Sequence, residues 1–172
     1  MLHGFRLQRY IIALKAFRKD VDLVLHIGTE KTGTTSIQEF LKKNIVRLRE
    51  NGVYIPQSPM VGYGNHRWIP LIANNDDFSD EFAIIQNFKS LKDRKESINK
   101  KRKELIDECR NAATSCKTLI FTSEHFQSRL RGIEEIQRLK KLVEELASRI
   151  RILIYIRDPL NTAVSRLSTA IK

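Results

Sequence analysis

The chain has 172 residues, of which 41% are hydrophobic and 30% are charged, a composition typical of a folded globular domain and not of a disordered one. Its 31 basic and 20 acidic residues give a formal net charge of +11, spread along the chain, which predicts an anionic ligand in general and does not single out nucleic acid. Two cysteines are too few for a disulfide scaffold or a cysteine-built zinc site, and no apolar run is long enough to span a bilayer.

Residues 1–20 form a basic amphipathic segment. Leu7, Ile11, Leu14 and Phe17 recur at helical spacing, and basic residues break up the apolar ones. The segment has no hydrophobic region of the kind a signal peptide needs, which favours a cytoplasmic protein. We expect a helix packed on the domain or a frayed leader, with weak peripheral contact to an anionic membrane as the alternative.

Strands and helices are predicted to alternate through residues 21–172, which we treat as one domain. Short apolar runs predict strands at 21–27, 53–55, 117–122 and 151–156. Helical spacing predicts helices over 34–51, 91–114, 133–147 and from Pro159 onward, with 67–90 helical in parts. This alternation indicates the α/β class, with crossover helices covering a central parallel sheet.

Nearly all the candidate binding and catalytic residues fall in three loops that follow strands. In an open α/β sheet, ligands bind outside the carboxyl ends of the strands. The loops selected by this rule are 28–35, 123–126 and 157–159. We therefore expect one ligand site at this edge of the sheet.

The first of these loops has the character of an anion cradle. It joins a buried strand to a helix start, so backbone N–H groups and the helix dipole favour negative charge. Gly33 allows close approach of a phosphate, the hydroxyl groups of residues 34–36 add donors, and Lys31 supplies a mobile positive charge. It is not a Walker A loop, because Lys31 precedes Gly33 and does not follow it.

The third loop places an arginine at a strand end and a serine in the following helix. Arg157 can grip a phosphate with its planar guanidinium. Asp158 and Pro159 are typical of the cap and first position of a helix, and Ser165 lies in its second turn.

Together the two loops resemble the donor site of sulfotransferases that use 3′-phosphoadenosine 5′-phosphosulfate (PAPS). The motif K-T-G-T-T at residues 31–35 resembles their 5′-phosphosulfate loop, and Arg157 with Ser165 resembles their 3′-phosphate site. The resemblance implies a P-loop-like three-layer sandwich. It also implies two groups of donor-binding residues, one on the phosphosulfate and one on the 3′-phosphate: Lys31, Thr32, Gly33, Thr34, Thr35 and Ser36, and then Arg157 and Ser165.

The middle loop offers the candidates for a catalytic base. Sulfuryl transfer to an alcohol or amine needs a group that takes the acceptor's proton. Glu124 and His125 both qualify, and Glu124 is slightly preferred. Glu30 is an alternative base or a group that tunes Lys31, and His66 is a weaker candidate for acceptor contact. His26, inside a strand, reads as a core histidine.

The predicted function is therefore transfer of a sulfuryl group from PAPS to a hydroxyl or amine acceptor, with Lys31 and either Glu124 or His125 as catalytic residues. The acceptor, a glycan, a lipid or a small molecule, is open, and neither a metal nor nucleic acid is required. The alternatives are a P-loop-like nucleotide kinase and a non-catalytic nucleotide-binding relic. Compared with the family the chain lacks downstream elements, so we expect donor-site remnants more firmly than turnover.

Overall fold

The computed structural model describes residues 20–171, so the amphipathic segment predicted over 1–20 lies almost entirely outside the described residues. Twelve elements follow one another in this part of the chain. They are β1 (Asp22–His26), α2 (Thr34–Lys43), α3 (Ile45–Glu50), β2 (Val53–Tyr54), α4 (Trp68–Ala73), α5 (Glu81–Ile85), α6 (Leu91–Ala112), β3 (Thr118–Thr122), α7 (His125–Arg129), α8 (Ile133–Leu146), β4 (Arg149–Leu153) and α9 (Pro159–Ala170).

The four strands form one sheet in the order β2-β3-β1-β4, and every described pair is parallel. β1 is central, with His26 opposite Thr122 of β3 and Leu153 of β4. Because these strands are parallel, the carboxyl ends of β1, β3 and β4 lie at the same edge of the sheet. The predicted parallel sheet is confirmed.

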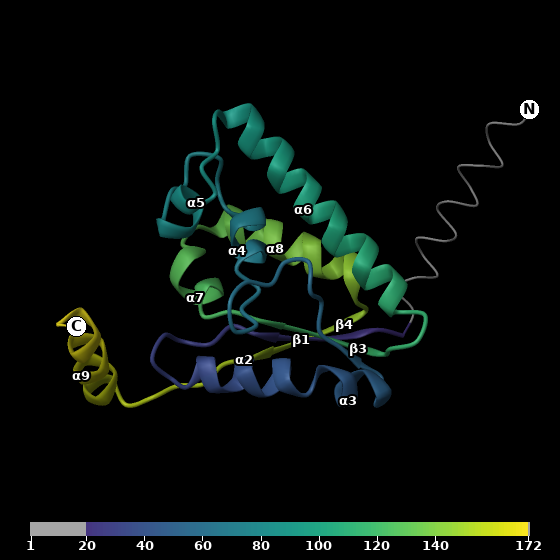
Figure 1. The fold of residues 1–172 in the computed structure, drawn as a ribbon, viewed down its shortest axis with the longest axis horizontal. Coiled ribbons are helices and arrows are strands. Elements are labelled where there is room, and N and C mark those ends of the chain that lie inside the picture. Colours follow the sequence, from purple (N-terminus) through teal and green to yellow (C-terminus); the bar gives the residue numbers. More distant parts are fainter. Residues whose placement is uncertain (1–19, 172) are drawn as a thin grey trace, which may run out of the picture.

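Helices cover both faces of the sheet. Figure 1 shows α2 and α3 below the strands and α4, α6, α7 and α8 above them, while α9 lies beyond the carboxyl ends of the strands. The structure is therefore a three-layer α/β sandwich, as predicted. The chain leaves β1 toward the lower layer and leaves β3 toward the upper layer, which opens a crevice between these two strand ends.

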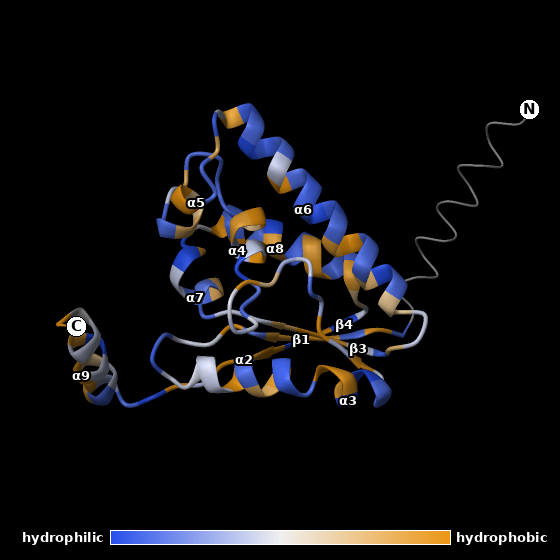
Figure 2. Ribbon diagram, in the orientation of Figure 1, coloured by the Kyte–Doolittle hydropathy of each residue, from blue (hydrophilic) through white to orange (hydrophobic). Residues whose placement is uncertain are grey.

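The main core lies between the sheet and the upper helices. Leu23 of β1 and both Leu119 and Phe121 of β3 are fully buried, and they belong to one cluster with Leu105 of α6 and Leu146 of α8. Because successive side chains of a strand point to opposite faces of the sheet, the residues between these buried ones face the lower layer of helices. Most of α6 is coloured as hydrophilic in Figure 2, as expected for a solvated charged helix.

The helix predicted over 34–51 is divided in two at Asn44, which was not foreseen. The Asn44 side chain donates a hydrogen bond to the Phe40 carbonyl at 2.8 Å, and the backbone of Asn44 leaves the helical region with φ −107° and ψ 13°. Asparagine side chains compete in this way with the helical hydrogen bonds. The division is confined to the lower layer and leaves the amino terminus of α2 unaffected.

The strand β4 forms an edge of the described sheet and ends earlier than predicted, at Leu153 in place of residue 156. The chain then runs extended to Asp158, whose side chain caps α9 by accepting a hydrogen bond from the Asn161 amide at 3.1 Å. Pro159 occupies the first turn, so the predicted helix start is confirmed. None of the helices in residues 20–171 is long and apolar enough to cross a membrane.

Candidate functional site

The three predicted loops come together at the carboxyl ends of the strands. A cavity of about 380 Å³ opens there, between the β1 loop, the β3 loop and α9. Six of the predicted residues line it together with Glu30 and Thr169: Lys31, Gly33, Thr34, Thr35, Glu124 and His125. The cavity therefore coincides with the crevice between β1 and β3, from whose carboxyl ends the chain continues to opposite faces of the sheet.

The β1 loop is built from tight left-handed turns. Gly28, Lys31 and Gly33 have φ values of 42°, 67° and 86°. A Cβ atom at Gly28 would lie 3.0 Å from the Thr34 hydroxyl oxygen, so glycine is needed there for close packing as well as for its backbone conformation. These turns lead the chain directly from the end of β1 into α2.

Gly33 is the N-cap of α2, and no side chain in residues 20–171 caps this helix. Residues 34–36 therefore occupy the first helical turn. The Thr34 and Thr32 hydroxyls both donate to the carbonyl of Thr29, at 3.2 and 2.6 Å, so they brace the loop from inside. Thr35 is exposed and lines the cavity. The amino terminus of α2 thus presents an uncapped positive dipole end to the cavity.

Polar contacts tie the carboxyl-terminal part of α9, and Arg157 just before this helix, to the same loop. The Lys31 ammonium donates to the Thr169 hydroxyl at 2.7 Å, and the Arg157 guanidinium donates to the Lys31 carbonyl at 3.2 Å. Glu30 pairs with Arg166 of α9 at 3.5 Å and with Arg129 of α7 at 3.8 Å. Lys31 and Arg157, which are 126 residues apart in the chain, therefore share one corner of the molecule.

Four of the predicted donor-binding residues do not line the cavity: Thr32, Arg157, Ser36 and Ser165. Ser36 is exposed on the first turn of α2. Ser165 is half-buried on α9, one turn before Thr169, whose hydroxyl donates to the Ser165 carbonyl at 3.0 Å. The Ser165 hydroxyl itself makes no hydrogen bond to the part of the chain that the structure describes, so it is free to donate to a ligand.

Glu124 is held in place through one carboxylate oxygen. Its Oε2 atom accepts hydrogen bonds from the side-chain amides of Gln38 and Asn65, both at 2.9 Å. Its Oε1 atom lies 3.6 Å from Nε2 of His125 and accepts no hydrogen bond from residues 20–171. Sequence reasoning missed Gln38 and Asn65, because an amide side chain in a helix or a loop carries no recognisable pattern.

His125 lies where several charged groups meet. Burial and the nearby Arg67 lower the pKa of His125 well below its ordinary value, although Glu124 opposes this. The ring is therefore neutral at neutral pH. Its Nδ1 atom is buried and has no hydrogen-bond partner among the described residues.

A second cavity of about 250 Å³ adjoins the first, and His125 lines both. Its walls include Val61 and Phe82 and a network in which Asp80 accepts from both Arg67 and Arg129. His125 thus lies between the two cavities, and Glu124 lines the first of them.

His66 was the weaker candidate for acceptor contact, and its burial in the structure argues against that role. The side chain is fully buried, its Nδ1 atom accepts from the Thr122 amide at 3.0 Å, and its Nε2–H donates to the Pro56 carbonyl at 3.0 Å. Both ring nitrogens are therefore used to fasten the 56–66 loop to the end of β3. His26 is 2% exposed and hydrogen-bonded to Thr122, which confirms it as a core histidine.

Stability should fall on mild acidification because of His66. Burial lowers the pKa of His66 from 6.5 to about 4. As the pH falls from about 6.5 toward 4, the unfolded chain therefore binds a proton at this histidine that the folded chain does not, and the free energy of unfolding decreases. A shift of this size corresponds to about 3 kcal/mol of unfolding free energy. Urea unfolding at a series of pH values measures it.

The variant His66→Gln separates this effect from the titration of carboxylates. It should be less stable than the wild-type chain near neutral pH, and its stability should decline less steeply with acidification. Parallel pH profiles for the two proteins would contradict a buried neutral His66.

No groups of three or more His, Cys, Asp or Glu side chains that could hold a metal ion occur within the described range 20–171. Comparisons with protein-family models, with curated proteins and with solved structures find no match to this chain. Its function is therefore inferred from its own residues.

Proposed function

We propose that the chain is a PAPS-dependent sulfotransferase with a P-loop-like donor site. The observation that carries this proposal is the contact between Arg157 and the carbonyl of Lys31, at 3.2 Å. It brings the residues that resemble a 3′-phosphate site next to those that resemble a 5′-phosphosulfate loop. A single nucleotide with charges at both ends can then bridge the two loops.

The chemistry of the donor site fits this ligand. The Lys31 ammonium and the uncapped amino terminus of α2 favour a phosphosulfate group in the cavity. Outside the cavity, the exposed Arg157 guanidinium makes only one hydrogen bond to the described residues, so most of its donors are open to a 3′-phosphate. The free Ser165 hydroxyl, two turns along α9, adds a neutral donor on the same side.

The bound donor supplies a sulfuryl group with a phosphate as its leaving group. Glu124 takes the proton of the acceptor hydroxyl or amine through its unbonded Oε1 atom, while Gln38 and Asn65 fix Oε2. The acceptor atom forms its bond to sulfur as the bond from sulfur to the phosphate oxygen breaks. Lys31 stabilises the negative charge that develops on this oxygen, and the bisphosphate leaves.

We place the acceptor in the second cavity, the one of about 250 Å³ that His125 also lines. Its wall residue His125 lies 3.6 Å, at Nε2, from the unbonded Oε1 atom of Glu124, and its other walls combine apolar side chains with Arg67 and Arg129. Glycan, lipid and small-molecule acceptors all remain within this proposal. Cys109 and Cys116 are free thiols, which suits the reducing cytoplasm we propose as its location.

Binding of 3′,5′-adenosine bisphosphate tests the donor site directly. The wild-type chain should bind this nucleotide more tightly than AMP, which lacks the 3′-phosphate. In the variant Arg157→Ala the bisphosphate should bind about 10- to 100-fold more weakly, since a charged hydrogen-bonding partner is lost, while AMP affinity stays unchanged. Isothermal titration calorimetry measures the affinities for the bisphosphate and for AMP. A fixed, near-physiological salt concentration limits the non-specific attraction of a basic chain for anions.

Arg149→Ala is the matched control. Arg149 is exposed like Arg157, but it lies in β4 and pairs with Asp22 at the amino end of the strands. Its removal should leave bisphosphate binding unchanged. Equal affinity in the wild-type and Arg157→Ala chains would contradict the proposed donor site, and tighter binding of ATP than of the bisphosphate would favour a kinase.

A further inference from the structure

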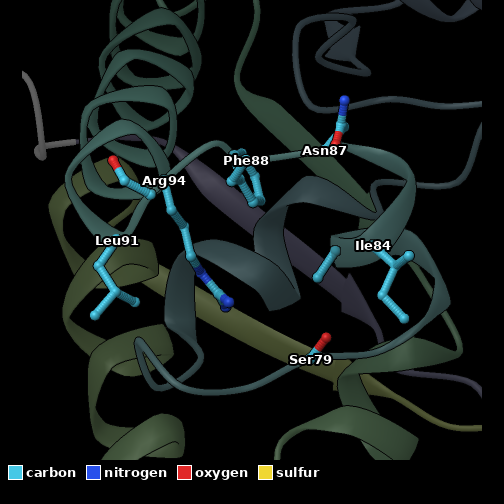
Figure 3. Close-up of a pocket in the computed structure, with 8 residues that line it drawn as sticks. Ser79, Ile84, Asn87, Phe88, Leu91 and Arg94 are labelled. Carbon is cyan, nitrogen blue, oxygen red and sulfur yellow. The ribbon is translucent and has the colours of Figure 1, made fainter.

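A third cavity, separate from the proposed donor site, is lined in part by the buried arginine Arg94. It has a volume of about 370 Å³ and lies between α5 and the amino-terminal turn of α6. It shares no lining residue with the cavity at Lys31. Figure 3 shows the guanidinium of Arg94 near the middle of the lining residues, with Leu91 on one side and Ile84 on the other.

The hydrogen-bonding capacity of Arg94 is largely unused. The residue is only 7% exposed, yet its guanidinium carries five N–H donors. One hydrogen bond to the described chain is present, from an Nη2 hydrogen to the carbonyl of Asn75 at 3.3 Å, and the buried Nε–H has no partner there. Buried donors are nearly always satisfied in folded proteins, by protein groups, ordered water or ligands, so most donors of this guanidinium are available to a bound acceptor.

The positive charge of Arg94 is also unpaired within residues 20–171. Its sequence neighbour Asp93 accepts instead from the Lys89 amide at 2.8 Å, and Lys95 pairs with Asp76 at 2.9 Å. The other strongly buried arginine, Arg67, is paired with Asp80. A buried cation without a carboxylate is costly, which makes Arg94 a ready partner for an anion that enters from solvent.

The walls of the cavity indicate what else the anion carries. The centre of the Phe88 ring lies 5.8 Å from the Arg94 guanidinium carbon, and Ile84 and Leu91, which also line the cavity, are 67% and 64% exposed. Ser90, the N-cap of α6, adds a hydroxyl and the positive end of a long helix dipole. A single planar cation beside apolar side chains matches one carboxylate attached to an apolar group.

We propose that this cavity is a second binding site, which takes a small organic carboxylate with an apolar substituent. The carboxylate accepts hydrogen bonds from the Arg94 guanidinium, and the apolar group lies against Phe88, Ile84 and Leu91. The site is independent of the sulfuryl-transfer proposal, because it uses none of the same residues.

Phenylacetate and phenylacetamide form a matched pair of probes. They share shape and apolar ring, but only phenylacetate carries a negative charge. In a titration of the wild-type chain followed by amide NMR shifts, phenylacetate should move the amide signals of Ser79, Phe88 and Ser90 in a saturable manner, and phenylacetamide should bind about tenfold more weakly or worse. This comparison needs no variant and so does not depend on one that folds.

Two variants assign the effect to Arg94. The substitution Arg94→Gln should weaken phenylacetate binding about tenfold and remove the preference over the amide, while Arg94→Lys should retain part of that preference. Circular dichroism verifies that both variants fold, and Lys31→Ala should bind phenylacetate at this cavity as the wild-type chain does. Absence of saturable shifts around the cavity, equal binding of the two probes, or undiminished binding by folded Arg94→Gln would overturn the proposal.

Discussion

Replacing Lys31 by alanine should lower the rate of sulfuryl transfer by about 10² to 10³, with little change in stability. Removing one group that stabilises developing negative charge in an active site costs about 3–4 kcal/mol of activation free energy. The Lys31 ammonium contacts only the Thr169 hydroxyl among the described residues, so its loss leaves the core intact. Transfer from radiolabelled PAPS to the best acceptor in a panel of phenols, alcohols, amines and sugars measures the rate.

Thr169→Val provides the control for Lys31→Ala. It removes the hydrogen-bonding partner of Lys31 but keeps the positive charge in the cavity, so its effect on the rate should be less than about tenfold. Undiminished turnover in Lys31→Ala would exclude Lys31 from the reaction. A large effect of Thr169→Val alone would instead indicate that α9 positions the lysine.

The location of the candidate site followed from the sequence because it depends on local patterns. Apolar runs marked where β1, β3 and β4 end, and parallel strands bring those ends to one edge. This was enough to predict that Lys31, Glu124 and Arg157 lie near one another. The hydroxyl groups of Thr32 and Thr34 were harder to place, since both turn inward to the Thr29 carbonyl and brace the loop.

Features that depend on long-range contacts could not be predicted. Asn65 and Gln38 reach Glu124 across 59 and 86 positions of the chain, and only the folded sheet brings them together. His66 lies in a glycine-containing loop that is typical of the surface, but two distant backbone segments bury it. The same applies to Arg94, which belongs to a charged helix and is nevertheless buried by residues 79–91.

Replacing Glu124 by glutamine should lower kcat for sulfuryl transfer by about 10² to 10⁴, the range typical of a lost general base. Glutamine is nearly isosteric, and its carbonyl oxygen can take the position of Oε2 and still accept from Gln38 and Asn65. The amide nitrogen then replaces Oε1, the atom that we propose takes the acceptor's proton. Binding of the bisphosphate should be unchanged, because Glu124 holds no part of the donor in this proposal.

Comparison with His125→Asn distinguishes the two candidate bases. The His125 ring has a pKa well below its ordinary value, because burial and Arg67 disfavour its charged form, and a group of such weak basicity is a poor proton acceptor at neutral pH. The loss in kcat should therefore be smaller for His125→Asn than for Glu124→Gln. The reverse order, with both variants folded and both binding the bisphosphate, would assign the proton transfer to His125 and leave Glu124 as the residue that positions its ring.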